Sequence, residues 1–283
     1  MDKPLTLAII GDSAASGVGD SDNFGNHFGW GYHLAQAFTE PLIYINAPRP
    51  GAQSKEVLHE QLPKILIHEP ELVAVIVGGN DLLRNGFSPA EFEVNLNETL
   101  RQIEEMGATA MLLELHDPTE IVPMPYLVAR VCRRRVDAVN RITRKMAMRY
   151  SALLLETRSL EEIYARNKWH VDRMHPSRHG HQFIADNFAH LLRMRGFEVD
   201  PVKFTFKNNR SRRDSIIWML KNGTPWFLKR SVDLLPAILF LSIGELIYMA
   251  RHRNEVAQSN IYYPDFAAHA DIHINRLQNE KVS

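Results

Sequence analysis

Residues 5–19 read LTLAIIGDSAASGVG, an apolar run that stops at Gly11-Asp12-Ser13 and passes into small residues. A continuous apolar segment before a Gly is typical of a buried strand that is covered on both faces. In open α/β sheets, ligands bind outside the carboxyl ends of the strands, where Ser13 would lie. Taken alone, the stretch favours a plainer interpretation, in which Asp12 or Ser13 simply caps the element that follows the strand.

Four more apolar runs alternate with helical patterns along the first two hundred residues. This alternation predicts βαβ units and a parallel sheet, with right-handed crossovers that place helices on both faces. The predicted strands are Leu5–Ile10, Leu42–Asn46, Leu72–Val77, Ala110–Leu115 and Ala152–Leu155. The predicted helices are Trp30–Thr39, Ser54–His68, Pro89–Met106, Pro125–Tyr150 and Ser177–Arg195.

Two helix ends carry local signals of their own. Ser88 precedes Pro89 and lies three residues before Glu91, which predicts a capped helix start with Pro at its first position. Gly107 predicts the end of the same helix. Pro176 is likewise predicted at the first position of the last helix.

A reactive serine needs a base that takes its proton and a group that orients that base. Histidine is the usual base because its pKa lies near the working pH. Asp172 and His175 are three residues apart in a turn, so the carboxylate can fold back onto Nδ1 of the ring. The alternative for this pair alone is a turn residue and a helix cap.

Four short segments follow one another along the chain: Gly11-Asp12-Ser13, Gly51 within Arg49–Ser54, Gly78-Gly79-Asn80-Asp81, and Asp172–Ser177. In this order they resemble the blocks of the SGNH (GDSL-type) hydrolase family, over roughly the first two hundred residues. The chain resembles a bacterial member that carries a C-terminal extension.

The resemblance implies a flavodoxin-like three-layer α/β/α sandwich with a five-stranded parallel sheet in the order 2-1-3-4-5. It also implies a catalytic set of Ser13, His175 and Asp172, acting as nucleophile, base and orienting carboxylate. The oxyanion hole would consist of the backbone N–H groups of Ser13 and Gly51 and the side-chain amide of Asn80. Such an enzyme needs no cofactor.

Departures from the family pattern are small. Ala14 stands where the family name has Leu. The Gly-x-Ser-x-Gly elbow of α/β-hydrolases is absent from residues 11–15, which argues against that other serine-hydrolase fold. Asp12 and Asp81 are predicted to fix loops as hydrogen-bond acceptors.

Several other features are not interpreted as sites. His175, His179 and His181 lack nearby carboxylate or Cys ligands at metal-site spacing, so no metal is predicted, and His179 and His181 are expected to face solvent. Residues 133–135, all Arg, are interpreted as the solvated face of a long helix. The single Cys132 excludes an intrachain disulfide and is interpreted as an inert packing thiol in a reducing, cytoplasmic compartment.

Charge divides the 283-residue chain into a hydrolase domain, 1–200, and a C-terminal extension, 201–283. The chain has 33 basic and 33 acidic residues overall, and 12 Lys and Arg against 7 Asp and Glu follow residue 200. Balanced charge gives no reason to expect nucleic acid as a partner.

An apolar run, 234–243, lies in this extension and is about half the ~20 residues that a spanning helix needs. Lys229, Arg230, Arg251 and Arg253 flank it. Three roles stay open for residues 229–253: packing on the hydrolase domain, a homodimer contact, or peripheral contact with the inner face of a membrane.

The sequence therefore predicts a serine ester hydrolase of esterase or lipase type, acting on small-molecule or lipid acyl esters through an acyl-serine intermediate. Thioesters, or transfer of the acyl group to an alcohol, would use the same residues. The contrasting alternative is a membrane-associated scaffold that keeps an inactive site.

Overall fold

A computed structural model of the protein describes residues 3–22, 26–84, 86–205 and 243. Its centre is a five-stranded, fully parallel sheet in the order β2-β1-β3-β4-β5. The strands are β1 (Leu5–Gly11), β2 (Leu42–Asn46), β3 (Leu72–Ile76), β4 (Thr109–Leu113) and β5 (Leu153–Leu155). The strand order that the family resemblance implies is confirmed.

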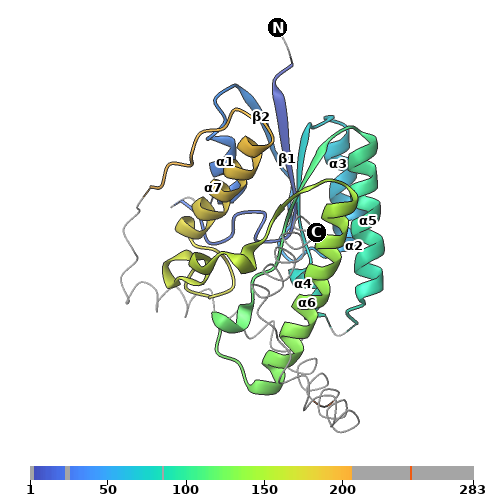
Figure 1. The fold of residues 1–283 in the computed structure, drawn as a ribbon, viewed down its shortest axis with the longest axis vertical. Helices are drawn as coiled ribbons and strands as arrows, with labels where there is room; N and C mark the ends of the chain where they lie inside the picture. The colour runs from blue at the N-terminus through green and yellow to red at the C-terminus, as the bar shows by residue number, and fades with distance from the viewer. Residues whose placement is uncertain (1–2, 23–25, 85, 206–242, 244–283) are drawn as a thin grey trace, which may run out of the picture. The chain divides into compact units, whose positions relative to one another are not determined.

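Helices cover both faces of the sheet (Figure 1). The helices α1 (Gly29–Ala35) and α7 (Arg178–Met194) pack together on one face. The other face is covered by α2 (Ser54–Glu56), α3 (Leu62–Leu66), α5 (Pro89–Glu105) and α6 (Tyr126–Arg149), and the short helix α4 (Gly79–Leu83) follows β3. Short 3₁₀ turns lie at Pro118–Glu120, Thr157–Ser159, Glu161–Tyr164 and Arg166–Lys168.

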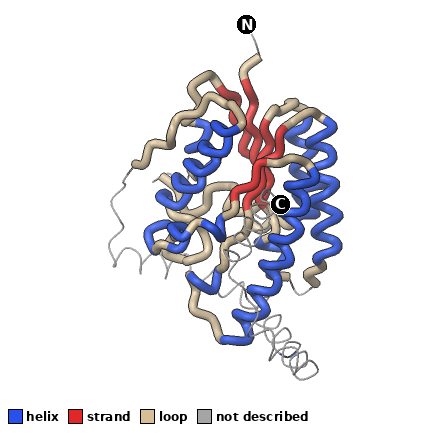
Figure 2. Tube along the Cα trace, in the orientation of Figure 1, coloured by secondary structure: helices blue, strands red, loops and turns tan. Residues whose placement is uncertain are grey.

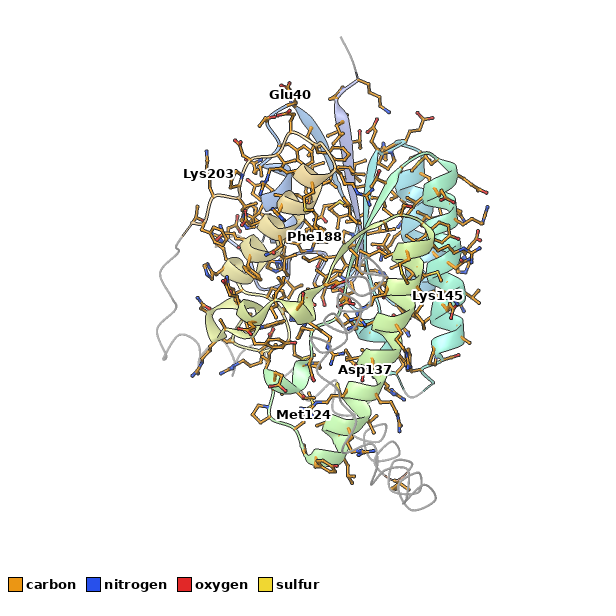
Figure 3. All side chains as sticks on the ribbon, viewed as in Figure 1. Glu40, Met124, Asp137, Lys145, Phe188 and Lys203 are labelled. Atoms are coloured by element: carbon orange, nitrogen blue, oxygen red, sulfur yellow. The ribbon has the colours of Figure 1, made fainter. Side chains whose placement is uncertain are left out.

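Each face of the sheet has its own hydrophobic core. Leu7 and Ile9 of β1 point into the core under α1 and α7, and Ala8 and Ile10 point into the core under α3, α5 and α6. On the first side Trp30 and Phe188 meet with ring centroids 5.0 Å apart, and Phe188 is labelled in Figure 3. Burial on both faces explains why β1 reads as an unbroken apolar run.

The helix predicted over residues 54–68 is interrupted. Between α2 and α3 the chain forms one turn of π-helix, Val57–Gln61. This turn carries the buried Gln61 side chain to the end of β1, where its carboxamide accepts from the Gly11 N–H at 2.7 Å and donates to the Gly11 carbonyl at 2.9 Å. Gln61 thereby holds both the N–H and the carbonyl of Gly11, which lies two positions before Ser13. π-turns of this kind occur frequently at functional sites.

The local helix signals are confirmed at one helix and corrected at another. The Ser88 hydroxyl accepts the Glu91 N–H at 3.2 Å, as the capping pattern predicts. The last helix begins two residues later than the position predicted for Pro176, because Ser177 is its N-cap and accepts the Gly180 N–H.

One surface prediction on a helix is wrong, and a second holds only for the exposed Arg134. His181 is fully buried: its Nδ1 accepts the Trp30 N–H, and its Nε2 lies 3.0 Å from the Val18 carbonyl. Burial lowers the pKa of His181 to about 4, which keeps the ring neutral. The arginines at 133 and 135 are not simply solvated, because Arg133 pairs with Asp117 and Arg135 donates to the Leu82 carbonyl.

Cys132 lies half-buried in α6. Burial raises the pKa of its thiol to about 11. A thiol with so little thiolate at neutral pH is a poor nucleophile.

The segment that follows α7 packs against that helix as far as Thr205. The Val202 N–H donates to Asp186, and the Gln182 side chain exchanges hydrogen bonds with Thr205. The chain divides into two units, 1–238 and 239–283. All described residues belong to the first unit except residue 243, which belongs to the second. The roles predicted for residues 229–253 therefore fall almost wholly outside the described residues. Among the described helices, none is both long and apolar enough to cross a membrane.

Candidate active site

Ser13 lies in the turn that follows β1, at the carboxyl end of that strand. Figure 2 shows the strands of the sheet side by side between the two layers of helices. The turn is held by Asp12, whose backbone N–H donates to the Ile76 carbonyl of the neighbouring strand at 3.1 Å. The Asp12 carboxylate accepts the Ala14 N–H at 2.9 Å, and the Asp12 carbonyl accepts the Ser16 N–H at 3.0 Å. The backbone on both sides of the serine is thus fixed by hydrogen bonds.

The structure brings Ser13, His175 and Asp172 into one chain of hydrogen bonds. Ser13 Oγ lies 2.8 Å from His175 Nε2, across 162 residues of sequence. On the far side of the ring, His175 Nδ1 lies 3.0 Å from Asp172 Oδ2. An ionised carboxylate only accepts, so Nδ1 carries the proton and Nε2 accepts the serine hydroxyl.

A tight turn before α7 presents the His175 ring. The residues on either side of the turn, Trp169 and Pro176, form an antiparallel bridge. Within it, the His170 N–H donates to the His175 carbonyl at 2.9 Å, and Arg173 adopts a left-handed conformation with φ of 57°. The base is therefore fixed by the backbone of its own turn as well as by the carboxylate.

Asp172 is surrounded by donors. Its Oδ1 accepts the backbone N–H groups of Met174 at 2.9 Å and His175 at 3.0 Å. Burial alone would raise the pKa of Asp172, but hydrogen bonds from His170 and His175 and these backbone donors hold the pKa well below its usual range. The carboxylate is ionised throughout the neutral range and can stabilise a positive charge on His175.

Gly51 and Asn80 also lie near the serine turn. Gly51 has a φ of 85°, which favours glycine, and the Arg49 N–H ties its loop to the Gly11 carbonyl at 3.1 Å. The Asn80 amide nitrogen lies 3.1 Å from the Ala52 carbonyl and 3.4 Å from Asp12 Oδ2, between the two loops. Within the described part of the chain, the N–H groups of Ser13 and Gly51 donate to no protein acceptor.

Asp81 makes the loop-fixing contacts predicted for it. It accepts the Ser54 N–H at 3.0 Å and the Ser54 hydroxyl at 2.6 Å. Asn95 of α5 in turn donates to the Ser54 hydroxyl at 3.1 Å. This buried network joins α4, which carries Asn80, to α2, which follows Gly51.

Asp12 is the other buried carboxylate of the site. Burial raises its pKa from 3.8 to about 6, although the Ala14 N–H and the nearby His175 partly oppose the effect. In the unfolded chain an Asp titrates near its ordinary value, so the folded protein binds more protons between about pH 4 and pH 6. The stability that protonated Asp12 contributes is present below about pH 4 and is lost as the pH rises through about 6.

Replacing Asp12 with asparagine should therefore change the pH dependence of stability. Across this window the wild-type protein loses up to about 3 kcal/mol of unfolding free energy to Asp12, and the D12N variant does not. Urea unfolding at pH 4, 6 and 8 measures this directly. The stability difference, D12N minus wild type, should rise with pH, and parallel curves for the two proteins would contradict the burial argument.

Two residues that contact this site were missed by the sequence analysis. His170 Nδ1 lies 3.2 Å from Asp172 Oδ2, and Gln61 clamps Gly11. The only signal for His170 was its closeness in sequence, two residues before Asp172 within the turn 170–173. Gln61 had no comparable signal, because its position depends on the π-turn.

No group of three or more His, Cys, Asp or Glu side chains able to hold a metal ion occurs in the part of the chain that the structure describes.

Comparison with known proteins identifies the family of the chain. Residues 9–183 match the model of the GDSL-like Lipase/Acylhydrolase family. The chain is 32% identical over 189 residues to thioesterase 1/protease 1/lysophospholipase L1 of Escherichia coli, covering 66% of this chain and 83% of that protein.

Solved structures show the same fold at lower identity. The esterase EstA from Pseudoalteromonas sp. superposes with a TM-score of 0.53 at 21% identity, covering 67% of this chain and 97% of EstA. The acetylxylan esterase Axe2 from Geobacillus stearothermophilus gives a TM-score of 0.55 at 20% identity, covering 74% of this chain and 97% of Axe2. The chain therefore belongs to the GDSL-like lipase/acylhydrolase family and is an ester hydrolase of that type.

Proposed function

We propose that the protein cleaves acyl esters through a covalent acyl-serine intermediate on Ser13. The observation that carries the proposal is the continuous path from Ser13 Oγ to His175 Nε2 at 2.8 Å and from His175 Nδ1 to Asp172 Oδ2 at 3.0 Å. A serine hydroxyl with a base at hydrogen-bond distance, and a carboxylate behind that base, is an activated nucleophile.

In the first half-reaction, Ser13 Oγ attacks the acyl carbonyl as His175 Nε2 takes the serine proton. The positive charge that forms on His175 is stabilised by Asp172, which stays ionised. His175 then gives the proton to the leaving alcohol as the carbon–oxygen bond of the ester breaks. The acyl group remains on Ser13.

In the second half-reaction, His175 takes a proton from water, and the water oxygen attacks the acyl carbon. Release of Ser13, which regains its proton from His175, yields the carboxylic acid. The proton from Ser13 leaves with the alcohol and the proton from water restores Ser13, so the two half-reactions balance without a cofactor.

Negative charge on the carbonyl oxygen needs donors that are already in place. The N–H groups of Ser13 and Gly51, which have no protein acceptor among the described residues, are assigned this role together with the Asn80 amide. One such donor is typically worth about 3 kcal/mol of barrier. The Asn80 amide lies between the loops of the other two donors, which supports the assignment.

Thioester cleavage is the second candidate, and the 32% identical relative named thioesterase 1/protease 1/lysophospholipase L1 favours it. The same residues serve a thioester, because only the leaving group differs. Transfer of the acyl group to an alcohol in place of water differs only in the second half-reaction.

A direct test compares wild type with the S13A variant on p-nitrophenyl esters from C2 to C16 and on acyl-CoA thioesters. The proposal expects S13A to lose activity on every substrate that the wild type cleaves, with an unchanged melting temperature. Retention of wild-type rates by S13A would refute the role of Ser13. The ratio of ester to thioester rates decides between the two candidates.

A further inference from the structure

Two imidazoles share one carboxylate oxygen in the active site. His175 Nδ1 lies 3.0 Å from Asp172 Oδ2, and His170 Nδ1 lies 3.2 Å from the same oxygen. The side chains of His170 and His175 are equally exposed, at 15%. The mechanism above uses only His175, and it leaves the second ring without a role.

His170 is held in this place from several sides. Its N–H donates to the His175 carbonyl at 2.9 Å, and its carbonyl accepts the Arg173 N–H at 3.0 Å. The loop at Gly19 packs against it, and a Cβ at Gly19 would lie 3.4 Å from His170 Cβ and 2.1 Å from the Pro176 carbonyl oxygen. The backbone of the turn therefore holds the His170 ring beside Asp172.

Four nitrogen atoms lie within 3.2 Å of the Asp172 carboxylate. Its Oδ1 faces two backbone N–H groups, and its Oδ2 faces the two rings. A carboxylate oxygen that already accepts one N–H has less charge to offer a second donor. The bond to His175 matters most when His175 becomes an imidazolium, since bonds between charged groups are about twice as strong as neutral ones.

We propose that His170 is a positioning residue that shares Asp172 with His175 and so limits how strongly Asp172 holds a proton on His175. The inference rests on the proposed function, because it concerns the base of that reaction. Its consequence is that His175 remains a free base, able to accept the Ser13 proton, to a lower pH than with Asp172 alone.

The charged groups on the elements around the turn have other contacts. Arg173 is in the turn itself. Beyond Gly19, the Asp20 carboxylate is held by His33 at 2.7 Å and Arg178 at 2.6 Å. The Lys168 ammonium lies 3.9 Å from the Phe183 ring centroid. Asp12, which interacts with His175 electrostatically, is present in every variant used below.

Protonation of His170 acts in the same direction. A positive charge on His170 beside Asp172 opposes the arrival of a second positive charge on His175. Both effects disappear when His170 is replaced with phenylalanine. Asparagine, by contrast, places an amide N–H near the position of Nδ1 and does not titrate.

The test measures the pH dependence of kcat/KM for p-nitrophenyl acetate between pH 5 and 9. We expect the acid limb of the H170F variant to move upward by about half a pH unit or more. The H170N variant should lie closer to wild type, and H190F, at an exposed His on α7, should match wild type. A structural role alone would lower activity at every pH without moving the limb. An H170F limb that superposes on the wild-type limb would overturn the proposal.

A second measurement does not depend on turnover. Histidine ¹⁵N NMR titrations of S13A and of S13A/H170F report the protonation of His175 directly, even if the protein proves not to hydrolyse esters. The His175 midpoint should be higher in the double variant, and equal midpoints would overturn the proposal. If H170F does not fold, S13A/H170A replaces it, because alanine also lacks the donor and the charge. The same rise of the His175 midpoint is expected, and an unchanged midpoint would overturn the proposal.

Discussion

Replacing Asp172 with asparagine is expected to lower kcat by about four orders of magnitude. Oδ1 accepts two backbone N–H groups, so the amide oxygen of the variant will take that position. The amide nitrogen then faces His175 Nδ1, which must become an acceptor. The ring proton moves to Nε2, toward Ser13, and the ring no longer accepts the serine proton.

The measurement is kcat for p-nitrophenyl acetate, with a melting curve to confirm folding. The matched control is D137N, a carboxylate that pairs with Arg158 away from the serine turn. The control should retain wild-type kcat within about threefold. A D172N enzyme within tenfold of wild type would show that the carboxylate does not set the tautomer.

Replacing Asn80 with alanine is expected to lower kcat by about 10²- to 10³-fold while KM changes by a few-fold at most. The loss should fall on kcat because the Asn80 amide is assigned to the transition-state oxyanion rather than to the bound ester. Truncation also removes the contact of Asn80 with the Ala52 carbonyl. Part of any stability loss will come from that contact.

N97A is the matched control, since Asn97 on α5 accepts the Tyr150 hydroxyl at 2.9 Å and does not contact the site. Full kcat and KM curves for both variants separate binding from catalysis. A reaction that slows less than fivefold in N80A, or that loses only substrate affinity, would remove Asn80 from the oxyanion hole.

Much of this architecture could be predicted from local sequence. β1 and β3 are buried on both faces and appear as unbroken apolar runs, and all five strands lie where those runs predicted them. The strand order came from the family resemblance. The motif residues could be placed near one another because the carboxyl ends of parallel strands meet at one edge.

What could not be predicted depends on contacts between distant segments. A helical pattern runs through residues 54–68, and nothing in it shows that one π-turn carries Gln61 to Gly11. His181 stands near a helix start, where solvent exposure is common, yet Trp30 and Val18 enclose it. The raised pKa of Asp12 likewise follows from its burial, which the Gly-Asp-Ser motif does not reveal.

The shared carboxylate is a second example. His170 and Asp172 are two residues apart, but their contact depends on the turn that the bridge between Trp169 and Pro176 closes. The family motif includes Asp172 and His175 but not His170. The position of His170 beside Asp172 could therefore be found only from the structure.

The central claim is that the Ser13 oxygen forms the covalent bond to the acyl group. Labelling the full-length protein with a fluorophosphonate, followed by peptide mass spectrometry, tests it most directly. One equivalent of label on Ser13, with loss of esterase activity in proportion and no labelling of S13A, is the predicted result. Complete loss of activity with the label on another residue, or unimpeded hydrolysis by protein fully labelled at Ser13, would contradict it.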